Sequence, residues 1–192
     1  MIRIALVGDI GSGKSYLSRQ FGYPVFSADK EVSKLYKKNN KCYLKLKKEL
    51  PDFIYSFPVK KNKLASAILY KQNNLKKIIK IVHPEIRKKM NVFVKKNKNK
   101  KIVILDIPLL LENKINTKSD IIIFVDAEKK EINKRLKKRS NFNLKIVKKL
   151  RKLQLPLEVK KKKSNFIIKN NFKNNSIRKN VKRILKKILL NA

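Results

Sequence analysis

The chain has 192 residues, of which 42% are hydrophobic, so it is long enough for one domain with a substantial core. Lys and Arg number 52 against 13 Asp and Glu, which gives a formal charge of +39. The basic residues are spread along the chain without an RNA-binding aromatic pattern, so we expect no specific nucleic-acid partner, only a general attraction for polyanions such as nucleotides.

The single cysteine, Cys42, excludes an internal disulfide, which fits a reducing compartment. Residues 2–7 already read as a strand, so we expect no secretion signal. The longest strongly apolar stretch, residues 102–111, contains Asp106 and Pro108 and is too short to span a bilayer. We therefore expect a cytoplasmic protein with no membrane partner, as a monomer or weak homo-oligomer.

The first motif along the chain is GDIGSGKS at residues 8–15, which fits the phosphate-binding loop (P-loop) pattern G-x-x-x-x-G-K-[ST]. It lies between the strand 2–7 and a helix at 16–21, as the motif requires. Three of the four glycines of the chain lie in it, which makes a chance match improbable. Its backbone amides would cradle phosphates, Lys14 would reach the outer phosphates, and the Ser15 hydroxyl would bind Mg²⁺. The predicted ATP-binding residues are Gly11, Ser12, Gly13, Lys14, Ser15 and Tyr16.

Further apolar patterns predict strands that alternate with helices. The predicted strands are residues 2–7, 25–26, 102–106, 120–125 and 166–168. The predicted helices are residues 16–21, 30–49, 64–70, 75–82, 83–94, 128–138, 144–153 and 176–190. Pro84 suits the first turn of the helix at 83–94. This alternation favours an α/β fold in which helices flank a parallel sheet, with a helical insertion over the site between the second and third strands.

Two features indicate which reaction the P-loop serves. Asp29 follows the second predicted strand, where ligands of open α/β sheets bind, and could accept a proton from an attacking hydroxyl. From its position alone, Asp29 could equally well be the N-cap residue of the helix that follows. Arg135 and Arg139 are four residues apart, on one face of a predicted helix, where they could neutralise a transferring phosphoryl group or form a solvated basic surface.

The chain resembles dephospho-CoA kinases over nearly its whole length. Besides the P-loop, the resemblance is carried by YPVFSAD at 23–29, HPEIR at 83–87, LDIPLLLE at 105–112, Arg135, Arg139, Gln154 and SNFIIKNN at 164–171. It implies ATP-dependent, Mg²⁺-assisted phosphorylation of the ribose 3′-hydroxyl of dephospho-CoA, the last step of coenzyme A biosynthesis. It also implies one P-loop kinase domain over residues 1–192, with a helical CoA-binding insertion at about 30–100 and a helical lid at about 128–152.

The resemblance further implies roles for single residues. Asp29 matches the aspartate that activates the acceptor hydroxyl, Lys14 and Ser15 match the phosphate and magnesium residues, and Arg139 matches the lid arginine that meets the ATP phosphates. The residues assigned to the substrate are Asp29, His83, Arg87 and Arg135. A structural hydrogen bond at a helix start remains an alternative for His83, and Asp106 either supports the magnesium site or caps the sheet end.

Several positions depart from the family pattern. Asp9 stands where glycine is usual and puts a carboxylate beside the phosphate loop, which could lower ATP affinity. The other departures are Ser27 for aspartate, Ser33 or Lys34 where Arg or His is common, Ser140 and Asn141 where an acidic residue follows the lid arginine, Lys160 for arginine, Ser164-Asn165 for Ala-Asp, and Phe172 for glycine. None removes a group that the chemistry needs. The alternatives are another small-molecule P-loop kinase acting on a nucleoside or nucleotide, and an RNA-binding protein that uses its basic surface.

Overall fold

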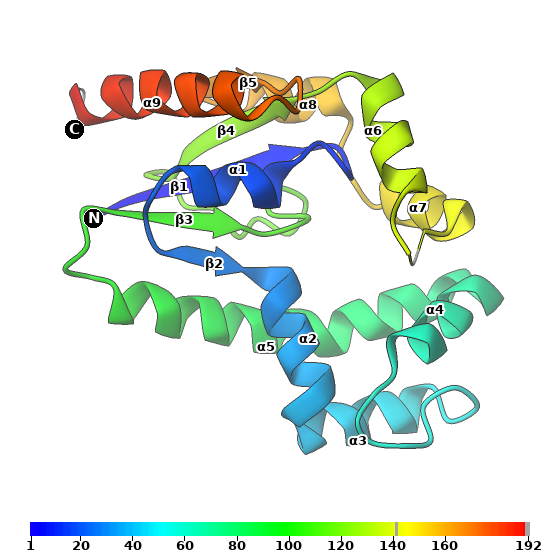
Figure 1. The fold of residues 1–192 in the computed structure, drawn as a ribbon. Helices are drawn as coiled ribbons and strands as arrows, with labels where there is room; N and C mark the ends of the chain where they lie inside the picture. The colour runs from blue at the N-terminus through cyan, green and yellow to red at the C-terminus, as the bar shows by residue number, and fades with distance from the viewer. Residues whose placement is uncertain (141, 191–192) are drawn as a thin grey trace.

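A computed structural model describes residues 1–140 and 142–190, which form an α/β structure with helices on both faces of a sheet (Figure 1). Within these residues, five strands form one parallel sheet in the order β2-β3-β1-β4-β5. The strands are β1 (Ile2–Gly8), β2 (Val25–Ser27), β3 (Ile102–Asp106), β4 (Ile121–Asp126) and β5 (Phe166–Lys169). The predicted fold class is confirmed. Because β1 lies in the middle of the sheet, the loop that follows it lies at the centre of the carboxyl edge, where ligands of such sheets bind.

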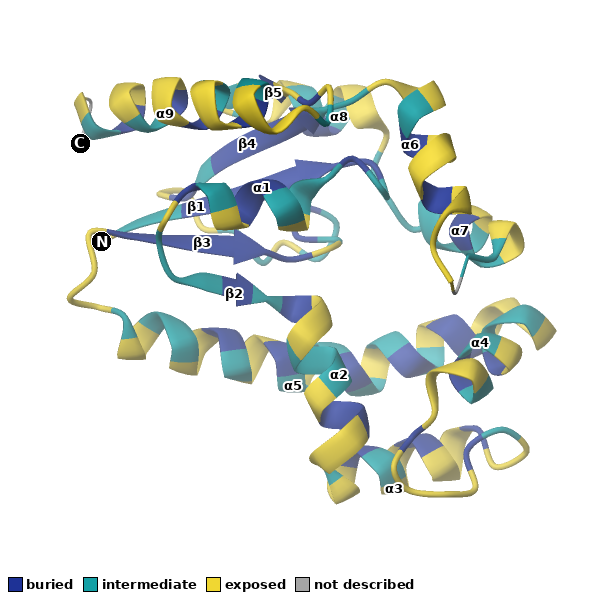
Figure 2. Ribbon diagram, in the orientation of Figure 1, coloured by how far each residue is buried: buried dark blue, intermediate teal, exposed yellow. Residues whose placement is uncertain are grey.

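Side chains of the central strands alternate between two hydrophobic cores, because successive residues of a strand point to opposite faces. Ile4 of β1 belongs to a core that includes residues of α1 (Lys14–Gln20) and α9 (Asn174–Leu190). Its neighbour Ala5 belongs to a second core on the other face of the sheet. The central strands are accordingly almost uniformly buried, whereas the helices expose their outer faces (Figure 2).

The helices that cover the second core connect β2 to β3. They are α2 (Ala28–Lys38), α3 (Asn40–Glu49), α4 (Lys61–Tyr70) and α5 (Gln72–Lys96). The predicted single helix at 30–49 is wrong, because Asn39 adopts extended backbone and separates α2 from α3. Its side-chain oxygen accepts a hydrogen bond of 2.7 Å from the Cys42 amide, so Asn39 caps the second helix rather than continuing the first.

Helix α5 runs without interruption through Pro84, so the predicted division into helices at 75–82 and 83–94 is wrong. An internal proline removes a backbone hydrogen bond and costs about 3 kcal/mol. The apolar stripe of α5 continues at helical spacing on both sides of the proline and is buried throughout: Leu75, Ile78, Val82, Ile86 and Met90. Burial stabilises by about 1.5 to 3 kcal/mol for each such side chain, which outweighs the cost of the proline.

Three short helices connect β4 to β5: α6 (Lys129–Lys137), α7 (Leu144–Arg151) and α8 (Leu157–Lys162). The sequence did not predict α8, which has six residues and packs against β1. The strand arrows in Figure 1 point toward the side where α6 and α7 lie, so these helices stand near the carboxyl edge of the sheet. Within residues 1–140 and 142–190, no helix has the uninterrupted apolar length needed to cross a bilayer.

Candidate active site

The P-loop connects β1 to α1, as predicted. Gly11 and Gly13 both have positive φ angles, 86° and 92°, and both are closely surrounded. A Cβ atom on Gly11 would lie 2.9 Å from Leu136 of α6, and one on Gly13 would lie 2.4 Å from the Asn170 amide nitrogen. Glycine is required at both positions for conformation and for space. The loop is thus held between α6 and the segment after β5.

The Lys14 ammonium lies inside this loop. It donates hydrogen bonds to the main-chain oxygens of Gly8 at 3.2 Å and Asp9 at 2.7 Å. The pKa of Lys14 is lowered from 10.5 to about 8, mainly by burial, with Asp106 opposing this decrease and the neighbouring Lys160 contributing to it. Lys14 is therefore a poorly hydrated cation that an anion would stabilise.

Two side chains with oxygen atoms, from Ser15 and Asp106, lie near Lys14. Asp106 ends β3 and is 4% exposed, and burial raises the pKa of its carboxyl group. Hydrogen bonding with Ser15 opposes that increase in pKa, so the two side chains lie near each other. A hydroxyl and one carboxylate suit Mg²⁺, which keeps several waters and is otherwise bound by substrate phosphates. Asp106 and Ser15 therefore fit the predicted magnesium site.

Asp29 lies in the first turn of α2, directly after β2, and is exposed. Its charge raises the pKa of both Lys14 and Asp106, so its carboxylate lies on the same side of the sheet as the P-loop. Asp29 also lines a cavity of about 170 Å³ between α2, α5 and the loop after β3. The position predicted for an acceptor-activating carboxylate is thus next to both the phosphate loop and a cavity.

His83 and Arg87 line the same cavity as Asp29. These are three of the residues that the sequence analysis assigned to the substrate. Most of the remaining lining is apolar and includes Val82, Ile86 and Met90 of α5. Apolar walls with a few convergent polar groups are typical of small-molecule sites.

His83 lies inside α5 and not at a helix start, so that part of its structural alternative is wrong, whereas the structural hydrogen bond of that alternative is present, with Asn113. Burial lowers the pKa of His83, opposed by a hydrogen bond with Asn113. Arg87 donates to the Asn113 main-chain oxygen at 3.3 Å. Both cavity residues are therefore oriented by one residue of the loop that follows β3.

The two arginines of the predicted lid do not share a helix face. Helix α6 ends at Lys137, so Arg139 lies beyond it, exposed to solvent, and the predicted geometry is wrong. The Arg135 guanidinium lies 4.4 Å from the centre of the Phe172 ring, a cation–π contact. The helix itself packs on the P-loop, because its Leu136 and the loop residue Ile10 belong to one small hydrophobic cluster.

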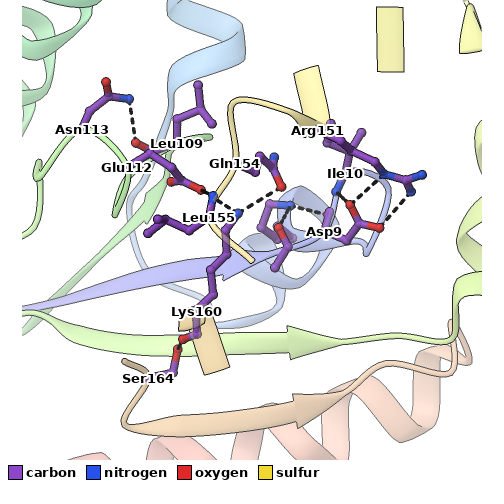
Figure 3. Close-up of polar contacts among 12 residues, drawn as sticks. Asp9, Ile10, Leu109, Glu112, Asn113, Arg151, Gln154, Leu155, Lys160 and Ser164 are labelled. Atoms are coloured by element: carbon purple, nitrogen blue, oxygen red, sulfur yellow. Dashed lines mark hydrogen bonds and ion pairs between the residues drawn. The ribbon is translucent and has the colours of Figure 1, made fainter. Parts of the chain in front are cut away.

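Sequence reasoning missed three contacts that build the site. Arg151 of α7 forms a bidentate ion pair with Asp9, and Lys160 pairs with Glu112 (Figure 3). The third contact is the Asn170 side chain, which donates to the Ser12 main-chain oxygen at 2.7 Å. A carboxylate in a phosphate loop calls for a nearby cation, but a chain with 52 Lys and Arg residues offers too many candidates. Within the described residues, the buried Ser12 hydroxyl of this loop has no hydrogen-bond partner.

Comparisons with known proteins match nearly the whole chain. A family model described as Dephospho-CoA kinase matches residues 2–176. The dephospho-CoA kinase of Wolbachia pipientis wMel is 32% identical over 194 residues, covering 98% of this chain and 99% of that protein. The dephospho-CoA kinase of Zymomonas mobilis is 32% identical over 173 residues, covering 88% of each chain.

Solved structures are similar over nearly the full length as well. TT1252 from Thermus thermophilus has a TM-score of 0.73 and 28% identity, covering 99% of this chain and 97% of that one. A dephospho-CoA kinase from Campylobacter jejuni has a TM-score of 0.63 and 25% identity, covering 97% and 96%. The chain belongs to the dephospho-CoA kinase family.

Proposed function

We propose that the chain transfers the γ-phosphoryl group of ATP to the ribose 3′-hydroxyl of dephospho-CoA and so forms coenzyme A, the last step of its biosynthesis. The observation that carries this proposal is the position of Asp29, which lines the α2–α5 cavity and acts electrostatically on Lys14 of the P-loop. An alcohol in the cavity and a triphosphate on the loop would meet at this carboxylate.

In the proposed reaction Asp29 accepts the proton of the acceptor hydroxyl as its oxygen attacks the γ-phosphorus. The bond between the γ-phosphorus and the oxygen that bridges to the β-phosphate breaks, and ADP leaves. Lys14 and the loop amides stabilise the negative charge of the transferring group. Positioning and charge stabilisation, more than covalent chemistry, lower the barrier in such transfers.

Mg²⁺ is the proposed cofactor, with Ser15 and Asp106 as the residues that would hold it. When bound, it would neutralise charge on the phosphate oxygens and orient them. We assign the acceptor to the insertion formed by α2 to α5, with His83 and Arg87 on the cavity wall. Residues at about 128–152 are the proposed lid, with Arg135 and Arg139 meeting the substrates and ATP after closure.

An acceptor screen tests the proposal. Purified chain, ATP and Mg²⁺ are combined with dephospho-CoA, nucleosides and nucleoside monophosphates, and kcat/KM is measured for each acceptor. We expect dephospho-CoA to be preferred by at least about a hundredfold, because a site built for one acceptor leaves polar groups unpaired with the others. Preference for a nucleoside or a nucleotide would instead support a kinase of another substrate class.

A further inference from the structure

Asp9 places a carboxylate inside a loop that, if the proposed function holds, must bind a triphosphate. Left unpaired, this charge would repel the phosphate oxygens that the loop amides attract. Asp9 is only 9% exposed, so water and salt screen its charge weakly. The loop therefore needs a cation that faces Asp9 without occupying the phosphate position.

Arg151, the last residue of α7, supplies that cation. Its Nε donates to Asp9 Oδ1 at 3.1 Å and its Nη2 donates to Oδ2 at 2.8 Å, a bidentate pair (Figure 3). Asp9 Oδ1 also accepts a hydrogen bond of 2.6 Å from the Ile10 amide, which fixes the turn of the loop. Both carboxylate oxygens are thus engaged with α7 and the local backbone, and the Lys14 ammonium is bound to main-chain oxygens instead.

Helix α7 also contacts the helical insertion, through α4. Lys149 donates to the main-chain oxygens of Ile68 at 2.6 Å and Leu69 at 3.0 Å, in the last turn of α4. Cations are favourable at that end of a helix, where the carbonyl groups lack partners. One short helix thus connects the phosphate loop to the helical insertion, and the pair formed by Asp9 and Arg151 is its polar link to the loop, beside the apolar contact of Val147 in the cluster that includes Ile10.

We infer that Arg151 is a positioning residue for phosphoryl transfer, which acts by neutralising Asp9 and holding the carboxylate away from the phosphate position. This inference rests on the proposed function. Arg151 touches Asp9 and not the reacting atoms, so its contribution depends on the presence of the carboxylate. Asp9 and Arg151 form a unit in which removal of the arginine alone is harmful and removal of both is much less so.

A double-mutant cycle tests this dependence. The variants are R151Q, D9N and D9N/R151Q, with K162Q as a control that removes one exposed positive charge from α8. The measurements are kcat, the KM for ATP, and the Kd for a non-hydrolysable ATP analogue by calorimetry. R151Q should raise the ATP KM and the analogue Kd about tenfold, because it leaves a carboxylate unpaired in the loop, with a smaller change in kcat. D9N/R151Q should recover most of that loss, and K162Q should resemble the parent chain.

Two results would overturn the inference: parent-like ATP affinity in R151Q, or equal weakness of R151Q and D9N/R151Q, which would place Arg151 on the nucleotide itself. Should R151Q fold poorly, R151K keeps the charge but not the bidentate geometry, and should bind the analogue with intermediate affinity. Failure of the proposed function has a different signature: the parent chain would bind the analogue without phosphorylating dephospho-CoA, while the binding measurements still decide the role of Arg151.

Discussion

Lys160 of α8 lies 2.8 Å from Glu112 in the loop after β3, measured from Nζ to Oε1. The same Glu112 oxygen accepts a hydrogen bond of 2.9 Å from the Leu155 amide, and Lys160 also donates to Gln154 Oε1 at 3.0 Å. The side chains of Lys160 and Glu112 are only 4% and 10% exposed. This buried network connects the segment after α7 to the loop that forms one wall of the cavity. It also holds the positive charge of Lys160 near Lys14.

Replacement of Lys160 by Met should destabilise the fold by about 3 kcal/mol or more, because it leaves the buried Glu112 carboxylate without its cation. The measurement is the free energy of unfolding in urea. Lys88→Met is the matched control, since Lys88 pairs with Glu85 at 3.8 Å and its side chain is 76% exposed. Exposed pairs contribute about 0 to 1 kcal/mol. Equal losses in the two variants would contradict a structural role for the buried network.

The lowered pKa of Lys14 predicts a pH dependence of nucleotide binding. Above pH about 8 the free protein loses the Lys14 proton, so affinity for a non-hydrolysable ATP analogue should fall, by up to about tenfold for each pH unit. Between about 8 and 10.5 the unfolded chain holds a proton that folded Lys14 lacks, so this group makes folding stability rise with pH while binding weakens.

Calorimetry from pH 7 to about 9.5 measures this dependence. Lys14→Arg is the control, because arginine stays protonated at every pH in this range and should give a flatter profile whatever its absolute affinity. An unchanged affinity of the parent chain across the range would show that burial does not lower the Lys14 pKa as described.

Asp29→Asn should keep ATP binding and lose most of the transfer, with kcat reduced about 10² to 10⁴-fold, because the amide cannot accept the hydroxyl proton. Steady-state kinetics with dephospho-CoA, together with the analogue Kd, separate the two effects. Glu158→Gln, which removes an exposed carboxylate from α8, should leave kcat within about twofold of the parent value. Near-normal turnover of the Asp29 variant would eliminate this residue as the base.

Gly13→Ala should both destabilise the chain and abolish ATP binding. The added Cβ would lie 2.4 Å from Asn170 Nδ2 at a φ of 92°, so the Asn170 contact with the loop must move. Gly22→Ala is a control for backbone strain alone, because φ is 75° there and no atom lies within 4 Å of the added Cβ. That control should lose about 1 kcal/mol of unfolding free energy. A Gly13 variant that binds ATP as well as the control does would argue against the assigned loop geometry.

The sequence predicted the parts of the fold that follow from local patterns. Short apolar runs located the strands, and the P-loop glycines located the phosphate site, because each requires a particular conformation or burial. Two predicted helix boundaries were wrong: a break was predicted at Pro84 where the helix continues, and no break was predicted at Asn39 where one helix ends. At Pro84, packing of the α5 stripe overrides a local helix breaker. At Asn39, a side-chain hydrogen bond ends a pattern that looks continuously helical.

The candidate site shows a similar division. The resemblance to the family placed Asp29, His83 and Arg87 together, and all three line one cavity. The partner of Asp9 could not be predicted, because Arg151 lies 142 residues away and many other basic residues were equally plausible from the sequence. Helix α6 ends at Lys137, so Arg139 does not share a helix face with Arg135 as the sequence spacing suggested.

Regiochemistry of the product tests the central claim most directly. Purified chain with ATP and Mg²⁺ is supplied with dephospho-CoA or with an analogue that lacks the ribose 3′-hydroxyl, and the products are identified by phosphorus NMR and mass spectrometry. The account predicts coenzyme A phosphorylated at the ribose 3′ position and no transfer to the analogue. Phosphorylation of both compounds, or a phosphate at any other position, would contradict it.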